Sequence, residues 1–325
     1  MEENTLVITG LRAGFPGPQG EVIAADGVDL TVPRGTIVGL VGESGCGKSV
    51  TALSVMGLLP PPGRVKEGTI CFEGRDLTAL DQEARRKLRG DRMAMIFQDP
   101  MTSLNPVYPV GKQVAEVLRL HRGLDRKGAR EKTVDLFRQV GIPDPEARYD
   151  AYPRQLSGGL RQRVMIAMAM ACQPALLIAD EPTTALDGTI QAQILRLMAR
   201  LCRDQGTAIL LITHNMGVVA QLCDQVSVMY AGQVVEAAET FALFAAPRHP
   251  YTMGLLQAIP SVESTLDRLY TIPGTVPELR TPPPGCRFCP RCDRAQAICA
   301  QETPPLTQVS PGHWVRCFLA GKEGT

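Results

Sequence analysis

Residues 42–49 constrain this 325-residue chain more than any other stretch, because they read G-x-x-x-x-G-K-S between an apolar run at 36–41 and a helical-looking segment. Strand, loop and helix in that order are typical of a phosphate-binding loop, whose glycines let backbone N–H groups turn toward phosphate oxygens. Lys48 would reach the outer phosphates, and the Ser49 hydroxyl would ligate Mg²⁺ at the start of the helix. A Gly-rich turn without a ligand is the alternative. The predicted nucleotide-binding residues are Gly42, Ser44, Gly45, Cys46, Gly47, Lys48, Ser49 and Val50.

Composition describes a soluble globular protein, with 44% hydrophobic and 21% charged residues. The net charge of +1 gives no overall attraction to nucleic acid or to an anionic membrane, so no nucleic-acid partner is expected. The first residues are polar and acidic and lack the pattern of a signal peptide. The richest apolar stretch, 164–179, is too short to span a bilayer. We therefore expect a cytoplasmic chain whose membrane role, if any, comes through partners.

The apolar pattern divides the chain into segments of different character. Residues 4–32 alternate around a turn-rich stretch at 14–20, which predicts an antiparallel hairpin layer. Helical spacing dominates 101–170, and buried parallel strands are predicted at 175–179 and 208–213 around a crossover helix at 190–201. The predicted fold is α/β: a P-loop (RecA-like) core with a mostly parallel sheet, an antiparallel β layer and a helical subdomain at about 101–170. A nucleotide-binding domain at 1–259 would be followed by a small Cys-rich module at 260–325.

Polar side chains that can catalyse hydrolysis follow the predicted strands. Asp180 and Glu181 come directly after 175–179, where Asp180 would hold Mg²⁺ and Glu181 would accept a proton from the attacking water. Gln98 ends a strand and could touch Mg²⁺ or that water, and His214 could reach a γ-phosphate. Taken singly, the acidic pair could equally be solvated, Gln98 would be interpreted as a surface residue and His214 as a structural one. Together with the phosphate loop they predict a nucleotide hydrolase.

A second glycine-containing stretch lies at 156–159, where Ser157, Gly158 and Gly159 open a predicted helix. Free N–H groups and the positive end of the helix dipole would make it an anion site, and an ordinary serine N-cap is the alternative.

Six segments in sequence order resemble the motifs of ABC-type ATPases. They are the Walker A loop at 42–49, the Q-loop at Gln98, the signature at 156–159, Walker B at 176–181, the D-loop at 185–187, which ends in Asp187, and the H-loop at His214. The resemblance implies that two subunits pair head to tail, so that the Ser157 stretch of one closes over ATP held by the Lys48 loop of the other. Leu160 departs from the glutamine of many members. Phe15 is the candidate for stacking on adenine, and a loop or core aromatic is the alternative.

Three further stretches, 98–106, 158–167 and 249–252, resemble the ATP-binding subunits of dipeptide, oligopeptide and nickel importers. This narrower resemblance implies ATP hydrolysis that powers uptake of di- or oligopeptides from the cytoplasmic face of the membrane. It implies two integral-membrane permease subunits, which would dock at 101–107, a second ABC ATPase subunit and an extracytoplasmic solute-binding protein. Nickel or another small solute as cargo is one alternative, and a soluble redox-regulated ABC ATPase is another.

Five of the ten cysteines crowd the last forty residues: Cys286, Cys289, Cys292, Cys299 and Cys317. The C-x-x-C-x-x-C spacing is typical of iron–sulfur ligation, and zinc accepts the same ligands. The importer resemblance associates Cys286, Cys292, Cys299 and Cys317 with a [4Fe–4S] cluster and leaves Cys289 as an extra residue. Zinc and no metal stay open, and the role would be structural or redox-sensing. The scattered cysteines are interpreted as small core residues.

Overall fold

The structure is a computed structural model that describes residues 4–17, 20–98, 103–183, 187–259 and 270–320. The chain forms two compact units. Unit 1 contains Met1–Thr5, Val32–Thr36 and Ala79–Leu211, and unit 2 contains Leu6–Thr31, Ile37–Thr78 and Ile212–Thr325.

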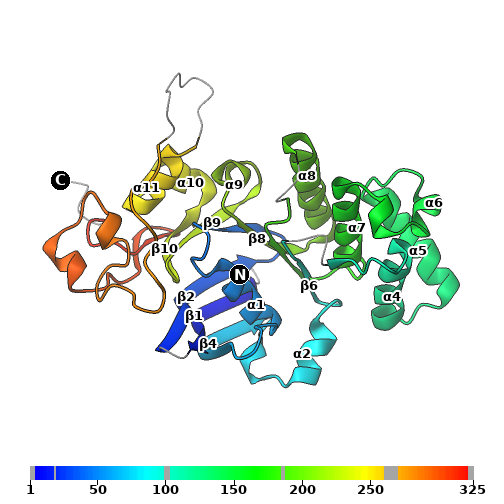
Figure 1. The fold of residues 1–325 in the computed structure, drawn as a ribbon, viewed down its shortest axis with the longest axis horizontal. Helices are drawn as coiled ribbons and strands as arrows, with labels where there is room; N and C mark the ends of the chain where they lie inside the picture. Colours follow the sequence, from blue (N-terminus) through cyan, green and yellow to red (C-terminus); the bar gives the residue numbers. More distant parts are fainter. Residues whose placement is uncertain (1–3, 18–19, 99–102, 184–186, 260–269, 321–325) are drawn as a thin grey trace. The chain divides into compact units, whose positions relative to one another are not determined.

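An antiparallel sheet in unit 2 confirms the predicted hairpin layer. Its strands are β1 (Asn4–Gly17), β2 (Gly20–Pro33), β4 (Arg64–Phe72) and β5 (Arg75–Asp76), in the order β2-β1-β4-β5 (Figure 1). β4 pairs with β1 from Leu6 opposite Phe72 to Gly14 opposite Arg64. The apolar pattern indicates only the end of β4, at 69–72, because its first half is largely exposed and charged.

A second set of strands in unit 2 has the order β11-β12-β10-β9-β3. β3 (Ile37–Val41) is buried at all five residues and runs parallel to β9 (Gln225–Tyr230). A continuous apolar run is typical of a parallel strand covered on both faces. β10 (Gln233–Glu239), β12 (His313–Val315) and β11 (Thr307–Ser310) extend the set in antiparallel fashion.

The helices of unit 2 are short. They are α1 (Lys48–Met56), α9 (Met216–Leu222), α10 (Thr240–Ala245) and α11 (Pro250–Gln257), with 3-10 turns η1 (Leu77–Ala79, which ends in unit 1), η3 (Cys289–Arg291) and η4 (Ala297–Ala300). α1 ends at Met56, because Gly57 takes a left-handed conformation (φ 62°) that caps the helix.

Aromatic packing and a buried carboxylate tie the C-terminal residues to β10 and α11. The rings of Tyr230 and Tyr251 lie 4.6 Å apart, and Phe288 lies 5.2 and 5.4 Å from them. Glu236 of β10, which is fully buried, accepts the N–H groups of Arg248 and His249 and lies 2.7 Å from Nε2 of His313. These contacts join residues on both sides of the expected boundary at 259/260, which stays a prediction.

Unit 1 contains strands in the order β8-β7-β6 and a group of helices. β6 (Met93–Ile96) runs parallel to β7 (Leu176–Asp180), and β8 (Ala208–Thr213), whose last two residues belong to unit 2, has the predicted bounds. The helices are α2 (Gln82–Leu88), α4 (Val110–Arg122), α5 (Arg126–Gln139), α6 (Pro145–Tyr149), α7 (Gly158–Met170) and α8 (Gly188–Gln205), with the 3-10 turn η2 (Pro153–Gln155).

Helices α4 to α7 pack together and confirm the predicted helical insert over its described residues (Figure 1). α4 buries Val110, Val114 and Leu118, which lie four residues apart on one face. α5 begins where the Asp125 side chain accepts the N–H of Gly128. In the described ranges, no helix is long and apolar enough to cross a lipid bilayer.

Candidate nucleotide-binding site

The loop between β3 and α1 depends on glycine at defined positions. Gly42, Gly45 and Gly47 have φ angles of 154°, 78° and 106°. A Cβ atom on Gly42 would lie 2.1 Å from the carbonyl oxygen of Met229, and one on Gly47 would lie 2.0 Å from that of Ala24. Because these neighbours are backbone atoms, no side chain fits at either position, and the loop keeps the close backbone course that a phosphate cradle needs.

Lys48 lies inside the curve of this loop. Its Nζ donates to the carbonyl oxygens of Gly42 and Glu43, each at 2.8 Å, and lies 3.6 Å from the Cys46 sulfur. Within the described loop, no side chain caps α1, and its first turn holds no acidic residue. The Ser49 hydroxyl is exposed in that turn. The buried ammonium and the uncapped N–H groups favour an anion, which fits the predicted triphosphate.

Two residues that the sequence analysis missed hold Glu43 of this loop. Arg291 donates from Nη1 and Nη2 to Glu43 Oε2 and Oε1, at 2.8 and 3.1 Å. The Tyr251 hydroxyl accepts the N–H of Glu43 at 2.9 Å. Burial raises the pKa of Tyr251, so its hydroxyl stays protonated. Arg291 is 248 residues from Glu43, and no local pattern in one sequence marks such a pair.

In unit 1 the structure brings Gln98 and Glu181 together. β6 and β7 are parallel with Ile96 opposite Ala179, so the residues that follow the two strands are neighbours. Gln98 Nε2 donates to Glu181 Oε2 at 3.1 Å. Asp180 is buried at the end of β7. Glu181 has a φ of 46°, a left-handed conformation that is unusual for a residue other than glycine and is enriched at functional sites.

Ser157 and Asp187 both cap helices in unit 1. The Ser157 hydroxyl accepts the N–H of Leu160 at 3.4 Å, and Gly158 and Gly159 form the first turn of α7. A Cβ on Gly159 would lie 2.9 Å from a methyl group of Ile190 in α8. The Asp187 carboxylate accepts the N–H of Ile190 at 3.0 Å. Ser157 therefore caps α7, and because a capping serine leaves other N–H groups of the first turn available for an anion, its anion-binding role stays a prediction.

The remaining predicted residues occupy separate places. His214 is exposed directly after β8. Phe15 is half-buried in β1, where a Cβ on Gly63 would lie 2.4 Å from its ring, so its role with adenine stays a prediction. Residues 101–102 and 185–186 of the predicted docking segment and D-loop lie outside the described residues. Lys48 belongs to unit 2 and Asp180 to unit 1, and their joint action on one nucleotide also stays a prediction.

All five C-terminal cysteines line one small cavity in unit 2. Burial raises the pKa of Cys292 to about 11 and also raises those of Cys286 and Cys317. Backbone N–H groups oppose the shift at each of these three sulfurs. The Cys299 sulfur accepts the N–H of Gln296 at 3.4 Å. Among the described residues, however, no group of three or more His, Cys, Asp or Glu side chains is arranged to hold a metal ion, so the expected metal site is not confirmed.

Comparisons with known proteins agree with this arrangement. Residues 25–184 match the family described as "ABC transporter", and residues 235–299 match "Oligopeptide/dipeptide transporter, C-terminal region". The oligopeptide transport ATP-binding protein AppD of Bacillus subtilis is 50% identical over 320 residues, 98% of both chains. The chain belongs to the family of ABC transporter ATP-binding proteins. The dipeptide transport ATP-binding protein DppD of Escherichia coli is 51% identical over 312 residues, 96% of this chain and 95% of DppD.

Solved structures of ABC transporter cassettes share the fold. The dimeric bacterial cassette MJ0796 aligns with a TM-score of 0.65 at 25% identity, over 72% of this chain and 98% of that one. CbiO1 of Clostridium perfringens, part of the transporter complex CbiONQ, aligns with a TM-score of 0.64 at 26% identity, over 75% and 92%. This ABC protein is accordingly an ATPase that uses ATP with Mg²⁺, and its family implies membrane permeases and a dimer of ATPase subunits.

Proposed function

We propose that this ABC ATPase powers the uptake of dipeptides or oligopeptides from the cytoplasmic face of the membrane. One observation carries the proposal: residues 235–299 match the C-terminal region of oligopeptide and dipeptide transporters in a chain about half identical to AppD and DppD along nearly its whole length. Nickel or another small solute is the second candidate cargo, since specificity would lie in the permease and in a solute-binding protein.

Each predicted site residue has a role in ATP binding or hydrolysis that follows from its chemistry. Lys48 and the loop N–H groups bind the phosphates, while Ser49 and Asp180 would hold the Mg²⁺ that neutralises them. Glu181 takes the proton of the attacking water, and Gln98, hydrogen-bonded to it, orients that carboxylate and the water. His214 contacts the γ-phosphate. Ser157, Gly158 and Gly159 complete the site of a second ATPase subunit, and Asp187 lies at the interface between the two.

Replacing Glu181 with Gln tests this division. The amide keeps the size of the side chain but cannot accept the proton, so ATP turnover should fall by about 10²-fold or more while ATP binding is retained. The variant should accumulate as an ATP-bound dimer in size-exclusion chromatography. Glu131→Gln, on the exposed face of α5, is the matched control and should turn over normally. Unimpaired turnover by Glu181→Gln would remove Glu181 from the catalytic role.

The permease contact and the cargo are tested together. Val107, the last residue of the expected docking segment, and Tyr108, which follows it, are 71% and 56% exposed. This is high for large apolar residues and supports a protein contact there. Purification from solubilised membranes should recover two permease subunits and a second ATPase subunit. The solute-binding protein that is genetically or physically associated with them is then tested for ligand binding. Binding of di- or oligopeptides supports the proposal, whereas binding of Ni²⁺ alone supports the second candidate.

We also propose that Cys286, Cys292, Cys299 and Cys317 hold a [4Fe–4S] cluster with a structural or redox-sensing role. Support comes from the shared cavity and from backbone N–H groups directed at these four sulfurs, whereas the pKa of Cys289 is shifted only by burial and by Cys299. Anaerobic purification should give a broad absorbance near ~400 nm and about four iron atoms per chain. Stoichiometric zinc, or no metal, would overturn the cluster.

A further inference from the structure

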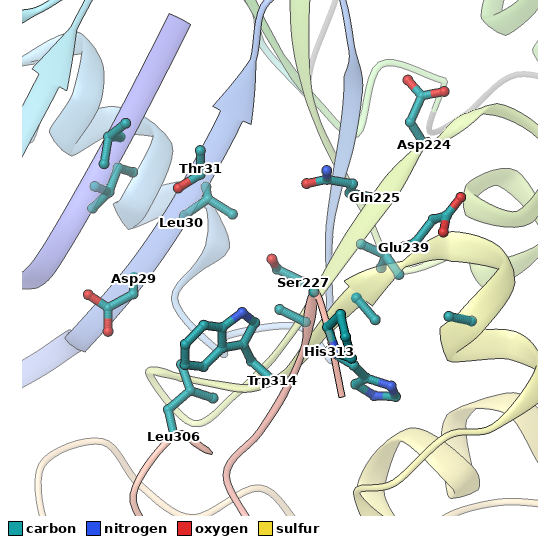
Figure 2. A pocket seen from close by; sticks show the side chains of 18 of the residues that line it. Asp29, Leu30, Thr31, Asp224, Gln225, Ser227, Glu239, Leu306, His313 and Trp314 are labelled. Carbon is teal, nitrogen blue, oxygen red and sulfur yellow. The ribbon is translucent and has the colours of Figure 1, made fainter. Parts of the chain in front are cut away.

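A cavity of about 790 Å³ lies in unit 2, outside the phosphate loop and the cysteine cavity. β2 contributes Asp29 and Thr31, β9 contributes Ser227, β10 contributes Glu239, and β12 contributes Trp314 (Figure 2). The volume is within the range of small-molecule sites, which are typically mostly apolar with a few converging polar groups.

The Asp and Glu side chains that line this cavity give it a negative character. Asp29, Asp224 and Glu239 line it, and its described lining residues include no Lys or Arg. Two of these carboxylates are fixed: Asp29 Oδ1 accepts the N–H of Gly10 and Asp224 Oδ2 accepts that of Ile37, each at 2.8 Å. Arg316 is close enough to Asp29 for their charges to interact, but its guanidinium donates to backbone carbonyl oxygens. The cavity therefore favours a cation over an anion.

Two features of the walls point to an organic ligand. Ser227 is only 6% exposed, and its hydroxyl makes no hydrogen bond to any described residue, although it lines the cavity. Because this hydroxyl has no protein partner at the cavity wall, it is available to hydrogen-bond a ligand. Trp314, 41% exposed, presents its indole beside Leu306 (Figure 2). An indole face binds apolar groups and cations alike.

We propose that this cavity binds an organic cation: a primary amine or guanidine that carries an apolar or aromatic group. The cationic group would lie beside Asp224 and Glu239, and the apolar group would pack on Trp314 and Leu306. A polar atom of the ligand would satisfy the Ser227 hydroxyl. This site is separate from the residues assigned to ATP hydrolysis, and the inference does not depend on peptide transport.

The chain itself supplies the reporter for a test, because Trp314 is its only tryptophan. The full-length protein is titrated with 2-phenylethylamine, with its neutral counterpart 2-phenylethanol, and with ethylamine, which lacks the aromatic group. We expect 2-phenylethylamine to change the tryptophan emission saturably, with a Kd near ~1 mM for so small a ligand. The other two probes should bind at least about tenfold more weakly.

The charge requirement is tested with the double variant Asp224→Asn/Glu239→Gln, which keeps side-chain size and leaves an amide oxygen at position 224 to accept the Ile37 N–H. Its affinity for 2-phenylethylamine should fall at least about tenfold, whereas Glu131→Gln in unit 1 should bind as the wild type does. Thermal unfolding checks that the variants fold, and Glu239→Gln alone replaces the double variant if it does not. Equal binding of 2-phenylethanol, unchanged binding by a folded charge variant, or no saturable signal would overturn the proposal.

Discussion

Replacing Arg291 with Ala should weaken ATP binding, although Arg291 lies between two cysteines far along the chain. The guanidinium makes two charge-assisted hydrogen bonds to Glu43 and donates to the carbonyl oxygens of Pro273 and Ile272, at 2.9 and 3.2 Å. Its side chain is 5% exposed, whereas that of Glu43 is 27% exposed. Removing one partner of a buried pair costs about 3–5 kcal/mol, and partial hydration of Glu43 reduces this to about 2–3 kcal/mol.

That loss should appear in both stability and nucleotide affinity. Glu43 lies between Gly42 and Gly45 of the phosphate loop, so losing its partner leaves the loop less ordered, and ATP binding must then order it. We expect the Kd for a fluorescent ATP analogue to rise roughly 5- to 10-fold, about 1–1.4 kcal/mol. Arg291→Lys keeps the charge but loses the fork, and should recover only part of the effect.

Arg138→Ala is the matched control, because Arg138 pairs with Asp135 and Glu146 on the surface of unit 1, with all three side chains more than half exposed. It should change stability by less than about 1 kcal/mol and leave ATP affinity unchanged. A double-mutant cycle with Glu43→Gln isolates the pair. If Arg291→Ala binds ATP within twofold of the wild type, or if the cycle shows no coupling, the C-terminal residues do not position this loop.

Two further predictions concern the loop and the pH dependence of stability. Gly47→Ala should abolish measurable ATP binding, because its methyl group would clash with the Ala24 carbonyl. Gly45→Ala has open space around its methyl group and is strained only by the positive φ, so it should lose about 1–2 kcal/mol of ATP-binding free energy. Equal losses of affinity in a nucleotide titration would refute the steric argument. Burial lowers the pKa of His249 from 6.5 to about 4. Between these pH values His249 is protonated in the unfolded chain but neutral in the folded chain. The free energy of unfolding therefore falls as the pH drops from about 6.5 to about 4. The loss is at most about 3 kcal/mol, and His249→Asn, which retains an acceptor for the Tyr251 N–H, should flatten that part of the pH profile in urea melts.

Local chemistry made much of this protein predictable from its sequence. The apolar runs of β3, β7 and β8 are buried on both faces, and that requirement is visible in the order of residues. The Gln98–Glu181 contact follows once two parallel strands are recognised, because both side chains come after strand ends. In these strands, burial on both faces of the sheet causes both the apolar run in the sequence and the position of the strand in the structure.

The rest depends on contacts that leave no local pattern. α2 buries none of its side chains and is stabilised by its Asp81 cap and by exposed pairs such as Glu83 with Arg86, so it has no apolar periodicity to detect. The pairing of β12 with β10 joins Trp314 to Ala237 across a long stretch of irregular chain. The Arg291–Glu43 pair likewise exists only once the chain has folded.

The placement of Glu236 has a consequence for how the protein is made. Its carboxylate is fully buried, yet its His313 partner is 77 residues further along the chain and leaves the ribosome long after β10 itself. Until then β12 cannot cover β10, and the region around Glu236 must stay hydrated or incompletely packed. A product that terminates before His313 would leave this carboxylate without one of its three partners. Degradation of such products is therefore favoured by the fold itself, and an ABC subunit that persists in the cell is one in which β12 has been made.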